Sequence, residues 1–113
     1  MEERLLKWLY DVKLAIDEIE SYFENESKIF SIYQNNTVIK RAVERNLEII
    51  GEAMNRIIKV YPDIPITDSK NIIGLRNQII HAYDNISDEY IWSVVSKHLP
   101  VLKSEVEKMI QGE

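Results

Sequence analysis

The chain has 113 residues, of which 45% are hydrophobic and 29% are charged, a composition typical of a single soluble globular domain covering residues 1–113. Its formal net charge of −5 argues against a protein that binds nucleic acids without sequence preference, because such proteins carry a basic surface. The absence of cysteine excludes disulfides, thiolate metal sites and cysteine nucleophiles.

The first residues, MEERLLKWLYDVK, are charged and amphipathic, and they lack the apolar core and the cleavage site of a signal peptide. No stretch approaches the ~18 consecutive apolar residues of a transmembrane helix. We therefore expect a cytoplasmic protein that does not enter a membrane.

Residues 2 to about 24 carry apolar side chains at intervals of three and four, which predicts an amphipathic helix. These side chains are Leu5, Leu9, Val12, Ile16, Ile19 and Phe23. Residues 25–36 are predicted to form a loop or a break between helices. Asn35, Asn36 or Thr37 is then expected to cap the next helix, since each has a short side chain that accepts a hydrogen bond.

The second helix is predicted to run from this cap to about Tyr61, where Pro62 and Pro65 end it. Gly51 lies inside the helix although glycine costs ~1 kcal/mol there relative to alanine. We interpret Gly51 as the point where another helix approaches closely.

A third helix is predicted over residues 70–82, with Thr67, Asp68 and Ser69 available as caps. Its isoleucines, Ile72, Ile79 and Ile80, are expected to face the core. Asp84-Asn85 reads as a turn, Ser87 as the cap of a fourth helix to about His98, and Pro100 as the start of a fifth. The predicted fold is an all-α bundle of four to five helices.

Chemically useful side chains gather in the third helix, as Arg76-Asn77-x-x-x-His81-x-Tyr83. Arginine grips a phosphate group through its planar guanidinium. Histidine readily accepts or gives a proton near neutral pH. This set is suited to phosphate chemistry without a metal ion.

The helical spacing places Asn77 and His81 one turn apart, at an angular separation of about 40°. Arg76 and His81 are separated by about 140°. They share a cleft only if the cleft wraps around the helix or a second chain completes it.

A purely structural interpretation stays open. In it, Arg76 pairs with Glu52 or another acid of a neighbouring helix, and His81 and Tyr83 close the helix end. His98 is interpreted as structural. Glu48 and Glu52 are one turn apart but lack a Glu-x-x-His partner, so we predict no metal site.

Three segments resemble the HepT-like proteins of the HEPN superfamily. The motif at residues 76–83 resembles their Arg-x4-His-x-Tyr signature. Residues 41–58, with Ile-Gly-Glu-Ala at 50–53, resemble the family's second-helix block. Ile91-Trp92 and the run Leu99-Pro100-Val101-Leu102 resemble its closing segment. Together these segments span nearly the whole chain in the family's order.

The resemblance implies a HEPN-like helical bundle that forms a homodimer, with the two motif helices meeting across a cleft. It implies an endoribonuclease that needs no metal or cofactor and acts as the toxin of a toxin–antitoxin module. Arg76 and His81 would be catalytic, cleaving RNA (tRNA or mRNA) by 2′-hydroxyl attack, with Asn77 and Tyr83 in support. The antitoxin would be an MntA-type nucleotidyltransferase that silences the toxin by AMPylation of Tyr83.

Two alternatives remain at the level of sequence. One is a non-catalytic module that binds a nucleotide or the nucleotidyltransferase partner in the same cleft. The other is a helical dimerisation domain in which Arg76 and His81 serve packing. In any dimer we expect an exposed apolar strip of the motif helix, or Trp8 and Tyr10, to be buried.

Overall fold

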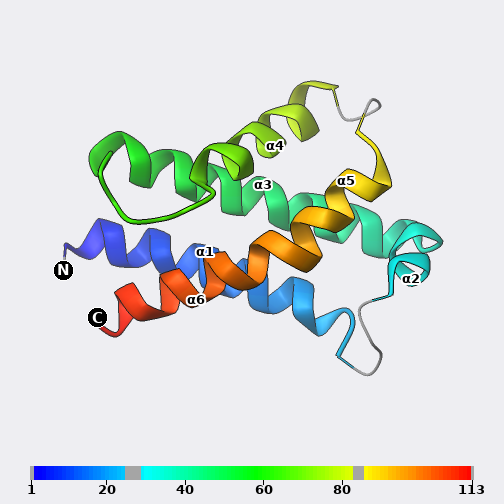
Figure 1. The fold of residues 1–113 in the computed structure, drawn as a ribbon, viewed down its shortest axis with the longest axis horizontal. Helices are drawn as coiled ribbons and strands as arrows, with labels where there is room; N and C mark the ends of the chain where they lie inside the picture. The colour runs from blue at the N-terminus through cyan, green and yellow to red at the C-terminus, as the bar shows by residue number, and fades with distance from the viewer. Residues whose placement is uncertain (1, 25–28, 83–85, 113) are drawn as a thin grey trace.

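The computed structural model describes residues 2–24, 29–82 and 86–112, and the regular structure in these ranges is entirely helical (Figure 1). The elements in chain order are α1 (Glu3–Ser21), α2 (Phe30–Gln34), α3 (Thr37–Val60), α4 (Ser69–Ala82), α5 (Asp88–Ser93), a π-helical segment (Val94–His98) and α6 (Leu99–Ile110). The predicted all-α bundle is therefore confirmed.

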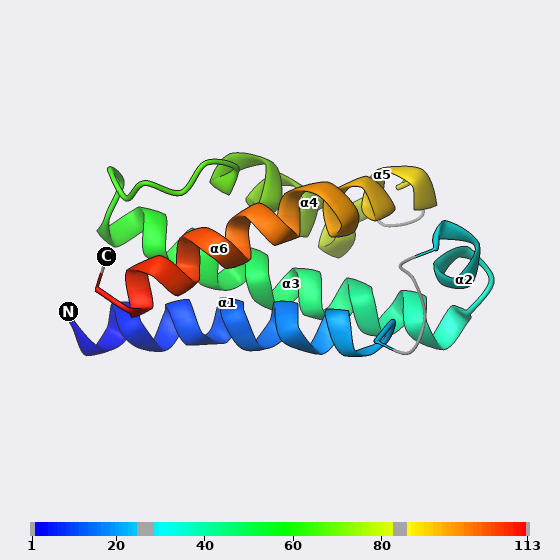
Figure 2. The ribbon, with the colours of Figure 1, turned by 60° about the horizontal axis from the view of Figure 1, so that its bottom comes forward.

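The two longest helices, α1 and α3, lie side by side and form the base of the bundle (Figure 2). Helix α4 packs on α3, and α6 packs on α1, so that the second half of the chain covers the first. Both termini lie at one end of the molecule, and α2 lies at the other (Figure 1). Helix α4, which carries Arg76, Asn77 and His81, thus packs on the 24-residue helix α3.

The core forms where the apolar periodicity predicts it. From α1 it takes Leu5, Leu9, Val12, Ile16 and Ile19; from α3 Val43, Leu47, Ile50, Met54 and Ile57; and from α4 Ile72, Leu75 and Ile79. Burying one such side chain stabilises the fold by roughly 1.5–3 kcal/mol. Ile80 departs from the prediction, because its side chain is 43% exposed. It lies about 100° around the helix from Ile79, which moves it out of the core to a hollow beside α3.

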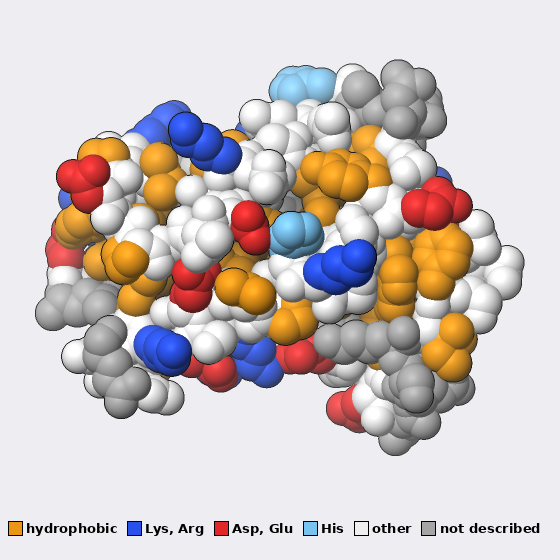
Figure 3. Space-filling model, in the orientation of Figure 1, with side chains coloured by type: hydrophobic (Ala, Val, Ile, Leu, Met, Phe, Trp, Pro, Cys, Tyr) orange, Lys and Arg blue, Asp and Glu red, His pale blue; other side chains and the backbone are white. Residues whose placement is uncertain are grey.

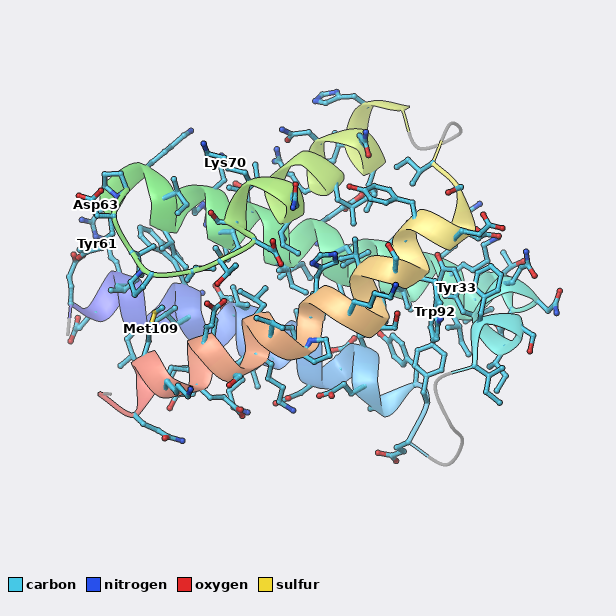
Figure 4. All side chains as sticks on the ribbon, viewed as in Figure 1. Tyr33, Tyr61, Asp63, Lys70, Trp92 and Met109 are labelled. Atoms are coloured by element: carbon cyan, nitrogen blue, oxygen red, sulfur yellow. The ribbon has the colours of Figure 1, made fainter. Side chains whose placement is uncertain are left out.

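The short helix α2 corrects the prediction of a loop over residues 25–36. Five residues do not form a stable helix alone, so α2 depends on its tertiary contacts. Tyr33 is fully buried and stacks on Trp92 of α5 at 5.6 Å between ring centroids, and Phe30 lies 6.3 Å from the same ring. Figure 4 shows Tyr33 and Trp92 together at the α2 end of the molecule.

The predicted caps of the second and fourth helices are confirmed. The Asn36 side chain accepts a hydrogen bond from the Ile39 amide at 3.0 Å, and the Ser87 hydroxyl accepts one from the Tyr90 amide at 3.1 Å. Pro100 falls in the first turn of α6, as predicted. The fourth and fifth helices nevertheless follow each other without a loop, through the π-helical segment.

The start of α4 is tied to the C-terminal part of the chain. The Thr67 hydroxyl donates to the Glu105 carboxylate at 2.6 Å, and the Thr67 amide also donates to it. The Asp68 carboxylate lies 2.8 Å from Nδ1 of His98. These contacts agree with the structural interpretation of His98. They join Thr67 and Asp68, the two residues before α4, to α6 and to the π-helical segment.

Lys103 fastens α6 to α1. Its ammonium donates to Glu20 at 2.6 Å and lies 3.0 Å from Asp17. Hydrogen bonds to these two carboxylates raise the pKa of Lys103 above its ordinary value. Among the helices that the structure describes, none is long and apolar enough to span a membrane.

Candidate functional site

Helix α4 positions the motif against α3. Ile72, Leu75 and Ile79 recur at intervals of three and four, and they are buried against the rest of the core. This fixes which edge of α4 faces α3 and which edge faces solvent. Arg76 lies at the boundary between the two, with 23% of its side chain exposed, whereas Asn77 and His81 are exposed.

The Arg76 guanidinium is held by two acceptors. Nη2 forms an ion pair with the Glu52 carboxylate of α3, and Nη1 donates to Oδ1 of Asn77 at 2.8 Å. The Nε–H is buried and finds no partner among the described residues. Because arginine carries five N–H donors, two remain on the terminal nitrogens for an incoming anion. The pairing of Arg76 with Glu52, left open by the sequence, is confirmed.

Gly51 makes this arrangement possible. A Cβ atom at Gly51 would overlap Cβ of Arg76 and lie 2.7 Å from its Cγ. Any larger residue at position 51 would therefore push the Arg76 stem, and α4 with it, away from α3. The prediction that Gly51 marks a close helix approach is confirmed, and the approaching residue is the arginine of the motif.

His81 lies one turn after Asn77 and is exposed near the end of α4. Within the described part of the chain, its imidazole makes no side-chain hydrogen bond. Asn77 bonds Arg76, and its predicted support of His81 stays a prediction. Tyr83 lies outside the described residues.

A pocket of about 330 Å³ opens beside Arg76, between α3, α4 and α1. It is lined by three arginines, three acids and three apolar residues: Arg45, Arg56, Arg76, Asp11, Glu48, Glu52, Ile49, Ala53 and Ile80. A second hollow of about 350 Å³ shares Glu48 and Ile80 with it and adds Arg41, Glu44 and Ile79. Together they form a groove along α3 and α4, which Arg76 enters and which His81 does not line.

The groove is close to electrically neutral, because each arginine has an acidic neighbour on α3. Arg41 pairs with Glu44, Arg45 with Glu48 at 3.3 Å, and Glu52 contacts both Arg56 and Arg76. On the face that Figure 3 shows, acidic and basic side chains are likewise interspersed with apolar ones. Such a surface can contact a phosphate group locally but does not attract polyanions over a distance.

Of the two predicted catalytic residues, Arg76 lines the first hollow, and His81 lines neither of the two. Arg76 pairs with Glu52 of α3 and lines the groove, whereas His81 is exposed and lies about 140° from Arg76 around an ideal helix. Within the described ranges, no group of three histidine and carboxylate side chains is arranged to hold a metal ion.

Two residues beside Arg76 were not predicted as parts of the site. Glu52 was considered as a pairing partner and as half of a metal pair, and Gly51 only as a packing residue. In the sequence, the two residues are adjacent in the run at residues 50–53, where glycine directly precedes glutamate. This adjacency is the sequence feature that could have identified them.

Comparisons with known proteins agree with this architecture. A family model described as "Ribonuclease HepT-like" matches residues 12–109. A Methanocaldococcus jannaschii protein named as a candidate RNase is 35% identical over 98% of this chain and 92% of its own length. A Thermococcus cleftensis protein named as a probable ribonuclease HepT is 31% identical over 90% of this chain and 92% of its own. No solved structure gives a significant match.

Proposed function

This chain belongs to the ribonuclease HepT-like family, and we propose that it is an endoribonuclease that cleaves RNA without a metal ion. The observation that carries the proposal is the fixed orientation of the Arg76 side chain. Its guanidinium is fixed by Glu52 and Asn77 at the edge of an open groove, with terminal N–H donors still available. Five residues further along the same helix, His81 is exposed.

The reaction we propose uses the nucleophile that RNA itself carries. The 2′-hydroxyl attacks the adjacent phosphorus, and the bond to the 5′-oxygen of the next nucleotide breaks. One proton must leave the 2′-oxygen and one must reach the 5′-oxygen, leaving a 2′,3′-cyclic phosphate and a 5′-hydroxyl. His81 serves as general base or general acid, a role suited to an imidazole that is open to solvent.

Arg76 would stabilise the transition state of this reaction. The pentacoordinate phosphorus carries more negative charge than the starting phosphodiester, and a fixed guanidinium favours that charge. A donor that is already oriented needs no reorganisation when the charge develops. The contacts with Glu52 and Asn77 support this role.

We propose that the working site is shared by two chains. Arg76 and His81 lie about 140° apart around an ideal helix, so the histidine of one protomer would act beside the arginine of the other. Ile80 lies between them in sequence and is 43% exposed in the groove, and Leu14 and Tyr10 of α1 are 60% and 43% exposed. These apolar side chains support burial in a homodimer. Trp8, the other residue expected there, is partly buried against the core of its own chain.

We further propose that the chain is the toxin of a toxin–antitoxin pair that acts in the cytoplasm. Its antitoxin would be a nucleotidyltransferase that transfers AMP from ATP to the Tyr83 hydroxyl, releasing pyrophosphate. Tyr83 lies two residues after His81, so the added phosphate and nucleoside would occupy the space that the RNA backbone needs.

The modification is tested by the intact mass of the chain after incubation with such a partner and ATP. We expect the mass to increase by one AMP group per modified chain and RNA cleavage to fall in proportion. A Tyr83→Phe variant lacks the acceptor hydroxyl, so an equal mass increase in that variant would contradict Tyr83 as the site.

A second candidate function is a non-catalytic module that binds a nucleotide or a protein partner. The acidic neighbours of every arginine in the groove favour it, because they compete with an RNA phosphate. Incubating the purified chain with tRNA, mRNA and rRNA in EDTA separates the two functions. The nuclease produces new RNA ends, whereas the binding module leaves the RNA intact and binds a nucleotide in calorimetry.

A further inference from the structure

One carboxylate on α3 serves two arginines at the candidate site. Oε2 of Glu52 pairs with Nη2 of Arg76, and Oε1 lies 3.4 Å from Nε of Arg56. Of the two arginine side chains, that of Arg76 is 23% exposed and that of Arg56 is 57% exposed. Glu52 therefore links a guanidinium at the helix interface to one at the surface.

Contacts other than the one with Glu52 already restrict the conformation of the Arg76 side chain. Gly51 lets the Arg76 stem lie directly against the α3 backbone, and Oδ1 of Asn77 accepts a hydrogen bond from Nη1. With the stem and Nη1 fixed, the carboxylate on Nη2 determines how the guanidinium plane faces the groove. Without it, the one side-chain acceptor that Arg76 keeps among the described residues is Asn77, an exposed residue of its own helix.

We propose that Glu52 is a positioning residue for Arg76, which holds the guanidinium in its working orientation before the substrate arrives. This inference rests on the proposed function. It predicts that loss of the Glu52 charge lowers the rate of the chemical step more than the affinity for RNA. The reason is that a loosened guanidinium still attracts phosphate but must be reoriented in each transition state.

If Glu52 masked the charge of Arg76 instead of positioning it, the effects on rate and affinity would be reversed. If Glu52 only masked the positive charge of Arg76, removing its charge would strengthen RNA binding and leave the rate constant unchanged or higher. The sign of the change therefore distinguishes positioning from masking.

Glu48 offers a matched control. It lies one turn before Glu52 on α3, lines the same pocket and pairs with Arg45 at 3.3 Å. The structure gives it no contact with Arg76 among its ion pairs or hydrogen bonds. Glu48→Gln removes the same charge from the same pocket and leaves the Arg76 contacts in place.

The test compares kcat and KM of RNA cleavage for the wild type, Glu52→Gln and Glu48→Gln. For Glu52→Gln we expect kcat to fall by about 10- to 100-fold, as for a modest misplacement of a catalytic group, with KM nearly unchanged. For Glu48→Gln we expect a clearly smaller loss of kcat than for Glu52→Gln, because the contacts of Arg76 stay in place. An unchanged kcat in Glu52→Gln, equal losses in both variants or a fall in KM alone would overturn the proposal.

A second readout does not depend on activity. In 15N spectra of the arginine side chains, the Nη protons of Arg76 should exchange slowly by rotation in the wild type and in Glu48→Gln, and rapidly in Glu52→Gln. Equal rotation in all three proteins overturns positioning. If the wild type fails to cut RNA, the proposed function fails, while these spectra still decide whether Glu52 orients Arg76.

Discussion

Replacing Arg76 or His81 with alanine should reduce RNA cleavage by about 10²- to 10⁴-fold, the range for losing a transition-state charge donor or a general acid–base. The loss should appear in kcat, because both groups act on the reacting phosphate. Steady-state cleavage of a labelled RNA in EDTA measures it. A variant that cuts as fast as the wild type would contradict the assignment of that residue.

The second histidine of the chain provides the control for His81. His98 contacts Asp68 at 2.8 Å and fastens the start of α4, so His98→Ala should keep the chemistry and lower only the stability. His81 is exposed, and its replacement should change the free energy of unfolding by less than about 0.5 kcal/mol. Loss of activity without loss of stability then identifies a chemical role.

Mixing the two inactive variants tests whether the site is shared. If Arg76 of one chain acts with His81 of the other, a dimer of Arg76→Ala with His81→Ala contains one intact site. Random pairing then restores about one quarter of the wild-type rate, since half of the dimers are mixed and each has one working site of two. A mixture that stays inactive would place both residues of a site in one chain.

Substituting alanine for Gly51 should destabilise the bundle and disturb the site. The new Cβ at position 51 overlaps Cβ of Arg76. Side-chain rotation of Arg76 does not relieve this overlap, because rotation about χ1 leaves Cβ in place. We expect the free energy of unfolding to fall by about 1–3 kcal/mol despite the better helix propensity of alanine, and cleavage to fall as Arg76 shifts. Urea unfolding and the cleavage rate measure the two effects.

Gly74 is the matched control for Gly51. It also lies inside a helix, but a Cβ at Gly74 meets nothing within 4 Å. Gly74→Ala should therefore raise the free energy of unfolding by about 0.5–1 kcal/mol and leave cleavage intact. Equal stability of the two variants would mean that α3 and α4 do not touch at Gly51.

Most of the fold could be predicted because its signals are local. The apolar intervals in α1, α3 and α4 mark buried faces, and Asn36 and Ser87 mark helix starts through bonds to amides three residues away. Helix α2 was missed because its support is distant in sequence. Tyr33 and Phe30 fold onto Trp92, about sixty residues further along the chain.

The site was less predictable than the fold. The motif identified Arg76, but its orientation depends on where α4 crosses α3, and only the folded chain shows that the crossing is at Gly51. Ile80 was expected in the core because its neighbours are apolar, yet its angle on the helix leaves it in the groove. The sequence alone does not distinguish an apolar residue at the edge of a helix interface that faces the core of its own chain from one that faces a second chain.

The measurement that tests the central claim most directly is the cleavage, in EDTA, of an RNA oligonucleotide and of the same oligonucleotide with deoxyribose at the cut nucleotide. Metal-independent attack by the 2′-hydroxyl predicts that the all-RNA strand is cut to a 2′,3′-cyclic phosphate and a 5′-hydroxyl, and that the substituted strand stays intact. Cleavage of the deoxyribose strand, or loss of all cleavage in EDTA, would contradict the account.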